Sequence, residues 1–90
     1  MNADDELRAL ETEEWVRRML RDGEAWELIK TRRLTEQKTA KIIGTSQTAV
    51  SLYLRGKIFP RRAVCLRLAR LLKKLQAMPP SGDLERSGPR

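Results

Sequence analysis

Three short polar side chains, those of Gln47, Thr48 and Ser51, follow Ser46 at a spacing that places them on one face of a helix. In the major groove of DNA, a glutamine can pair bidentately with adenine N6 and N7, and a hydroxyl can bond a base edge. Leu52 also points outward in this register and can pack on a thymine methyl group. The predicted base-reading residues are therefore Gln47, Thr48, Ser51 and Leu52. The alternative is that they form an ordinary solvated helix face.

Cationic and helix-capping residues surround this cluster on both sides. Phosphate contacts fix the position of a protein on DNA, and both cations and helix N-termini can make them. The predicted phosphate-binding residues are Lys38, Lys41, Thr45, Ser46, Arg55, Lys57, Arg61 and Arg62. The cations have a second interpretation as solvated surface charge or, for Arg55 and Lys57, as favourable charge at a helix C-terminus.

Local signals predict two short helices that would position these side chains. Thr35 and Ser46 are favourable N-cap residues, since a hydroxyl oxygen accepts a hydrogen bond from a free N–H of the first turn. Gly44 can adopt the left-handed conformation that ends a helix, and Gly56 is expected to end the second one. Ala40 is small enough to let the two helices cross closely. We therefore expect a helix over 35–43, a glycine turn, and a helix over 46–55.

This pattern resembles the helix-turn-helix of the Cro/repressor (XRE-type) family. The resemblance rests on Ala40, Gly44, Ser46 and the run Val50-Ser51-Leu52-Tyr53-Leu54-Arg55-Gly56-Lys57, with Leu34-Thr35-Glu36-Gln37 similar to the family's entry sequence with two polar residues transposed. It covers about residues 24–76. It implies a compact lambda-repressor-like domain, usually dimeric on DNA, that binds short palindromic operators and regulates transcription. Thr39 and Thr45 depart from the family pattern, which has apolar residues there, and we expect weaker packing between the helices.

The remaining apolar periodicity predicts an all-α bundle of about five helices, with no strand. Thr12 is a plausible N-cap for a helix ending at Arg21, and Asp22-Gly23 indicates a break before a helix over 24–33, although one fused helix is the alternative. Pro60 is expected near position N1 of the last helix. The predicted organisation is an acidic flexible arm over 1–11, a DNA-binding domain over 12–78, and a disordered tail over 79–90.

Several apolar residues have two possible roles. Val64, Leu68, Leu71 and Leu75 are spaced as the core face of the last helix, and equally as a coiled-coil dimer seam. Trp15 and Trp26 are expected to anchor the core, and contact with a partner is the alternative for Trp15. Cys65 is expected to be a small buried filler.

Charge is divided unevenly along the chain, whose formal net charge is +7. Residues 1–14 contain six acidic residues and one basic residue, whereas residues 15–75 contain sixteen basic and four acidic residues. A basic body of this density attracts polyanions, because each neutralised phosphate releases counterions. Nucleic acid is therefore the leading expected partner. The acidic arm is either a solvated terminus or a screen that covers the basic face until DNA displaces it.

Composition argues against several other classes of protein. The chain has one cysteine and no histidine, so we expect no zinc site, no disulfide, no cofactor and no general base for an enzyme. It has no long apolar run and an acidic N-terminus, so we expect no membrane span and no secretory signal. No small-molecule ligand is indicated. The expected location is the cytoplasm, on the nucleoid when DNA is bound.

Three functions fit these features. The first is a sequence-specific transcription regulator that binds double-stranded DNA as a homodimer. The second is an architectural or recombination-accessory (excisionase-like) protein that uses the same motif to shape DNA. The third is an adaptor whose basic face binds an acidic protein.

Overall fold

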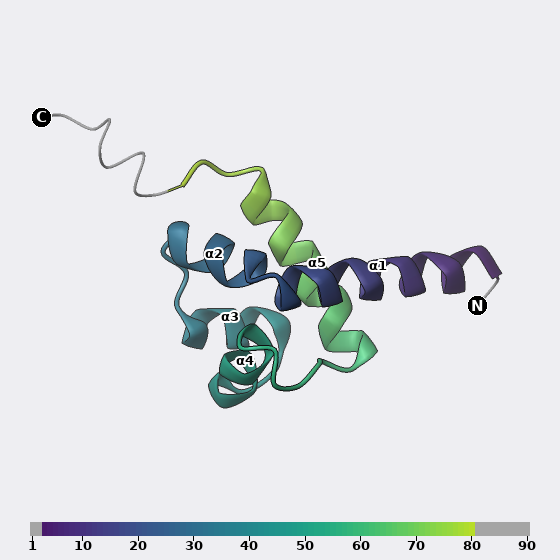
Figure 1. The fold of residues 1–90 in the computed structure, drawn as a ribbon, viewed down its shortest axis with the longest axis horizontal. Coiled ribbons are helices and arrows are strands. Elements are labelled where there is room, and N and C mark those ends of the chain that lie inside the picture. The colour runs from purple at the N-terminus through teal and green to yellow at the C-terminus, as the bar shows by residue number, and fades with distance from the viewer. Residues whose placement is uncertain (1–2, 81–90) are drawn as a thin grey trace, which may run out of the picture.

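The structure is a computed structural model that describes residues 3–80 of the chain, and within this range every regular element is an α-helix (Figure 1). The elements are α1 (Ala3–Arg21), α2 (Glu24–Thr31), α3 (Glu36–Ile43), α4 (Gln47–Leu54) and α5 (Arg62–Gln76). The predicted all-α bundle of about five helices is therefore confirmed. No helix among these residues is both long enough and apolar enough to cross a membrane. The predicted disordered tail falls mostly on residues 81–90, outside the described range.

The first helix is longer than its sequence signals indicate. It begins at Ala3 and continues without a break to Arg21, so the predicted helix start at Thr12 is wrong. Its first turn carries Asp4, Asp5 and Glu6, which interact favourably with the positive end of the helix dipole. The N-terminal half of α1 projects beyond the other helices (Figure 1).

Gly23 separates the first two helices. Its φ of 80° lies in the left-handed region, which glycine adopts without the steric cost of a Cβ atom. The predicted break at Asp22-Gly23 is therefore confirmed, and the alternative of one fused helix is wrong.

The last helix begins later than predicted. Arg61 is its N-cap, with an extended ψ of 164°, and Arg62 is the first helical residue. Pro60 is therefore buried ahead of the helix rather than at position N1. The helix packs against α1, α2 and α3, so it forms the centre of the bundle.

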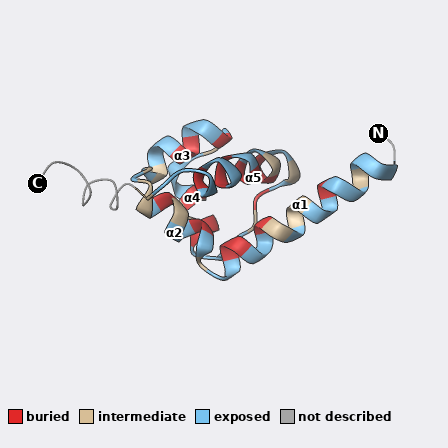
Figure 2. Cartoon of the chain, turned by 90° about the horizontal axis from the view of Figure 1, so that it is seen from above, coloured by how far each residue is buried: buried red, intermediate tan, exposed pale blue. Residues whose placement is uncertain are grey.

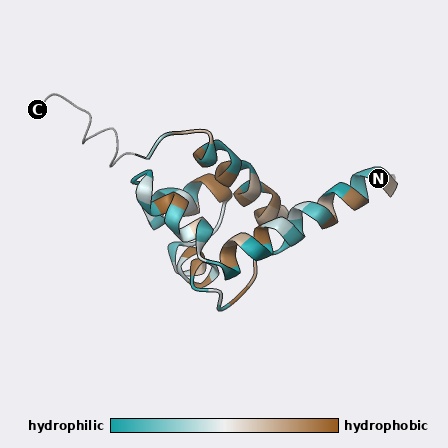
Figure 3. Cartoon of the chain, turned by 45° about the horizontal axis from the view of Figure 1, so that its top comes forward, coloured by the Kyte–Doolittle hydropathy of each residue, from teal (hydrophilic) through white to brown (hydrophobic). Residues whose placement is uncertain are grey.

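Apolar residues of α5 supply much of the core (Figures 2 and 3). Val64, Leu68, Leu71 and Leu75 are between 1% and 8% exposed in the single chain. Full burial of such a side chain contributes roughly 1.5–3 kcal/mol. The core interpretation is thus confirmed, and the proposal that these four residues form a dimer seam is wrong because the chain's own helices cover them.

The two tryptophans differ in their surroundings. Trp15 is partly buried against the core, as predicted. Trp26 is 42% exposed, so the prediction that it anchors the core is wrong. Ala25 and Ile29 occupy the buried face of α2, and Trp26 lies beside that face with the Lys30 Nζ 4.4 Å from its ring centroid. A cation over an indole is favourable, which gives this exposed ring a partner.

Candidate nucleic-acid interface

The predicted caps of α3 and α4 are both present. The Thr35 hydroxyl accepts a hydrogen bond of 3.0 Å from the Lys38 N–H, and the Ser46 hydroxyl accepts one of 3.0 Å from the Ala49 N–H. Each cap satisfies one of the N–H groups that a helix leaves free at its start. In each helix the cap hydroxyl bonds the N–H group three residues later, so the start of the helix follows from the local sequence.

The turn between α3 and α4 requires Gly44. Its φ is 77°, as predicted, and the N–H groups of Gly44 and Thr45 both donate to the Ala40 carbonyl at 2.9 Å. A Cβ atom at position 44 would lie 2.6 Å from Nη1 of Arg67 on α5. The Arg67 side chain therefore reaches the turn, and α3 itself packs against α5.

Thr39, which was expected to weaken the packing between α3 and α4, makes a hydrogen bond that compensates for the burial of its hydroxyl. Thr39 is completely buried, and its hydroxyl donates to the Thr35 carbonyl at 2.8 Å. Thr45 is half-buried in the turn. Across residues 3–80, no buried side-chain nitrogen or oxygen lacks a hydrogen-bond partner. The interior polar group at Thr39 thus avoids the penalty of an unpaired buried hydroxyl.

Opposite faces of α4 have different roles. Val50, Tyr53 and Leu54 are buried, as predicted, and hold the helix on the domain. The other face is accessible: Gln47 and Thr48 are exposed, while Ser51 and Leu52 are half-buried. The structure therefore brings all four predicted base-reading residues onto one face, although Leu52 is less exposed than expected.

This face of α4 forms a shallow hollow of about 340 Å³. Its walls are Gln47, Thr48, Ser51, Leu52, Arg55 and Glu36. Glu36, in the first turn of α3, was not among the predicted site residues. Its side chain brings an acidic hydrogen-bond acceptor to an otherwise neutral and basic surface.

Most of the predicted phosphate-binding residues are accessible. Lys38, Lys41, Ser46, Arg55, Lys57 and Arg61 are exposed, and Thr45 is half-buried. Six of these seven lie between the start of α3 and the loop after α4, in the same part of the chain as the predicted base-reading residues.

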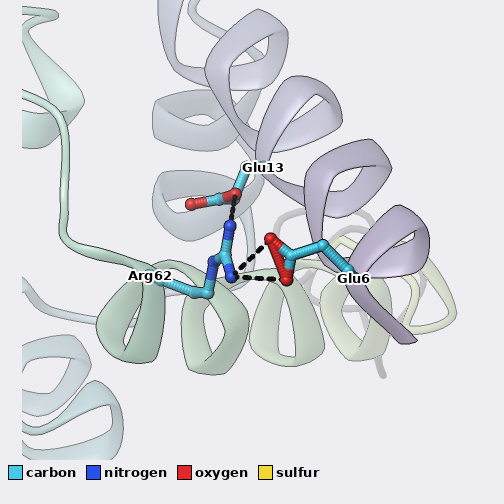
Figure 4. Close-up of polar contacts among 3 residues, drawn as sticks. All are labelled: Glu6, Glu13 and Arg62. Carbon is cyan, nitrogen blue, oxygen red and sulfur yellow. Dashed lines mark hydrogen bonds and ion pairs between the residues drawn. The ribbon is translucent and has the colours of Figure 1, made fainter. Parts of the chain in front are cut away.

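Arg62 is the exception (Figure 4). Its Nη1 donates to both carboxylate oxygens of Glu6, at 3.2 and 3.0 Å, and its Nη2 donates to Glu13 at 3.2 Å. These hydrogen bonds, with Glu6 the larger cause, raise the pKa of Arg62 above its ordinary value. A phosphate contact at Arg62 would compete with these two carboxylates of α1, and the phosphate-binding role of Arg62 stays a prediction.

Cys65 is a buried thiol, as expected. It is 0% exposed, and burial raises its pKa from 9.0 to about 11. Reactive cysteines are accessible and have lowered pKa values, so this thiol has the properties of a packing residue. Between residues 3 and 80, no group of histidine, cysteine, aspartate and glutamate side chains could hold a metal ion.

Comparison with known proteins identifies no relative of this chain. No protein-family model matches the sequence, and no curated protein or solved structure matches it either. The resemblance to the Cro/repressor family therefore rests on the motif residues alone.

Proposed function

We propose that this protein is a sequence-specific transcription regulator that binds double-stranded DNA and reads the major groove with α4. The observation that carries the proposal is the position of Gln47, Thr48 and Ser51 on the accessible face of a helix whose other face is buried. An α-helix fits the major groove, and short polar side chains can reach base edges from it. The supporting scaffold is a capped helix on each side of the Gly44 turn.

The chemistry of each contact follows from the side chains. Gln47 pairs with adenine, Thr48 and Ser51 bond base edges or a phosphate, and Leu52 packs on a thymine methyl group. Glu36 faces the same hollow and can accept a hydrogen bond from cytosine N4, while it disfavours a phosphate at that position.

The charged surroundings fit the same proposal. Lys38, Lys41, Arg55 and Lys57 are exposed and available for backbone phosphates, and Arg55 lines the reading face itself. We also propose that two copies bind a palindromic operator. Because the α5 stripe is buried within one chain, the two copies must meet through a different surface.

Selection of bound sequences from a random duplex library at about 150 mM salt tests the proposal, since exposed charge is well screened at that ionic strength. We expect enrichment of two half-sites with centres about 10 base pairs apart. Enrichment of a single half-site would retain sequence reading but contradict the dimer. No enrichment, with binding lost as salt rises, would favour the architectural or adaptor function instead.

Substitution of Gln47 tests the reading register on the selected site. Gln47→Ala should weaken binding by about 1–3 kcal/mol and relax the preference at one base pair. Gln76→Ala is the matched control, because Gln76 is also an exposed glutamine but lies at the end of α5. Equal weakening on selected and random DNA would show that Gln47 does not read a base.

A further inference from the structure

A second hollow, of about 510 Å³, lies between the end of α1 and the loop that follows α4. Four cationic side chains line it: Arg17 and Arg21 from α1, and Arg55 and Lys57 from the loop. None of the residues predicted to contact DNA, except Arg61 and Arg62, lies outside 38–57, and none lies in α1, which α2 separates from the motif along the chain. The folded chain nevertheless places two of its arginines beside two predicted phosphate-binding residues.

Local geometry explains how these four cations come together. Arg17 and Arg21 are four residues apart and so lie on the same face of α1. Gly56, with φ of 72°, turns the chain after α4, and the Lys57 N–H donates to the Leu52 carbonyl at 2.9 Å. The Arg17 guanidinium lies 4.6 Å from the centroid of the Phe59 ring, which orients its side chain in the hollow.

The positive charge of this hollow is little compensated. Among residues 3–80, no carboxylate lies within ion-pair distance of Arg17, Arg55 or Lys57. Arg21 has one partner, Asp22 at 3.6 Å, and both side chains are more than half exposed. Solvent-exposed pairs of this kind are weak, so Arg21 stays available to another anion. Arg62 differs, since two carboxylates contact it at 3.0–3.2 Å.

Arg55 lines both this hollow and the reading face of α4, so the two surfaces adjoin. A duplex whose major groove holds α4 has its phosphate backbone beside that helix. We propose that the hollow binds a backbone phosphate of the DNA that α4 reads, and that Arg17 and Arg21 make α1 part of the interface. This inference rests on the proposed function. Arginine suits the task, because its planar fork of donors matches phosphate oxygens.

The test compares two double variants of the full chain on the selected duplex and on a random duplex. Arg17→Gln/Arg21→Gln should weaken binding to both duplexes roughly tenfold at a given salt concentration, as expected when charge-assisted hydrogen bonds are lost. The plot of the logarithm of the association constant against the logarithm of the salt concentration should become less steep, by about 1–2 units of slope, because fewer counterions are released. The ratio of specific to random affinity should stay unchanged, since phosphates carry no sequence information.

Arg8→Gln/Arg18→Gln is the matched control. It removes the same charge from the same helix, at exposed positions that do not line the hollow. A second variant, Arg17→Lys/Arg21→Lys, keeps the charge and should retain most of the affinity and the salt slope. Melting temperatures of all variants separate loss of binding from loss of folding.

The outcomes distinguish this inference from the proposed function. If the wild-type chain reads a sequence but both glutamine double variants bind alike, α1 is not part of the interface and the inference is wrong. If Arg17→Gln/Arg21→Gln changes the specific-to-random ratio, phosphate binding is also contradicted. If the wild-type chain binds no DNA, the proposed function fails and the inference fails with it.

Discussion

The Nε atom of Arg32 donates a hydrogen bond of 2.9 Å to the backbone carbonyl of Leu75, 43 residues further along the chain. The Nη2 atom of the same guanidinium donates to the Met78 carbonyl at 2.8 Å. The last carbonyls of a helix have no partner within the helix, and a cation there also interacts favourably with the helix dipole. The residue that follows α2 therefore caps the end of α5 and ties two distant segments together.

We expect Arg32→Met to lower the free energy of unfolding by about 1–3 kcal/mol, because it removes both of these bonds. Urea denaturation followed by circular dichroism measures the change. Arg70→Met is the control: Arg70 is an exposed arginine of α5, and its substitution should change stability by less than about 0.5 kcal/mol. Equal losses in the two variants would show that the capping bonds contribute nothing.

Gly44→Ala should destabilise the protein through its backbone conformation, because a Cβ atom in the left-handed region costs roughly 1–2 kcal/mol. The new Cβ would lie 2.6 Å from Nη1 of Arg67, but this atom ends an exposed, flexible side chain that can move aside. Gly23→Ala is the control, since Gly23 has a similar φ of 80° and a Cβ atom there would have no neighbouring atom within 4 Å. We expect the two variants to lose similar stability in urea denaturation, and a much larger loss for Gly44→Ala would show that Arg67 does not move aside.

The buried thiol of Cys65 should make stability depend on pH at alkaline values. Its pKa is about 11 in the folded chain and 9.0 ordinarily, so the unfolded thiol ionises first as pH rises. The stability that the protonated, buried thiol contributes is fully present below pH 9 and declines between pH 9 and 11, with a total loss of about 3 kcal/mol. The measurement is the difference in unfolding free energy between wild type and Cys65→Ala. A pH-independent difference would contradict the prediction.

The pairing of Arg62 with α1 predicts how the acidic residues affect DNA binding. Glu6→Gln/Glu13→Gln should tighten binding to random DNA at low salt, because it removes two negative charges and frees the Arg62 guanidinium. The control Glu11→Gln/Glu14→Gln removes the same charge at exposed positions on the same helix. The first variant should show the larger effect, and the difference should shrink at about 0.15 M salt, where the Debye length is about 8 Å.

Substitution of Arg62 itself should show whether its side chain binds a DNA phosphate or stays paired with Glu6 and Glu13. Arg62→Gln should leave affinity for random DNA almost unchanged, whereas Arg61→Gln should weaken it, because Arg61 is exposed and Arg62 is occupied by Glu6 and Glu13. A larger effect of Arg62→Gln would mean that DNA displaces the two carboxylates.

Features determined by near neighbours could be predicted from the sequence. Thr35, Gly44 and Ser46 each act within about four residues of their own position, so their roles as caps or turn follow from residue type alone. The buried and accessible faces of α4 follow in the same way from the helical repeat. These local signals account for the arrangement of the candidate site.

Features that depend on distant segments could not be predicted. The pairing of Arg62 with Glu6 joins residues 56 positions apart, and the hollow around Arg17 joins α1 to the loop after α4. Periodicity also left the role of Leu68 open, because core and dimer seam require the same spacing. Only the packing of α5 against the other helices distinguishes the two.

The projecting α1 gives residues 3–80 an elongated outline, with principal extents of 53, 27 and 22 Å. A body about twice as long as it is wide experiences more friction in water than a sphere of equal mass, so it diffuses more slowly and elutes earlier from a sizing column. A single chain of 10.4 kDa would thus elute in the position of a heavier globular standard. Column elution alone would overstate the number of subunits, whereas light scattering reports mass independently of outline.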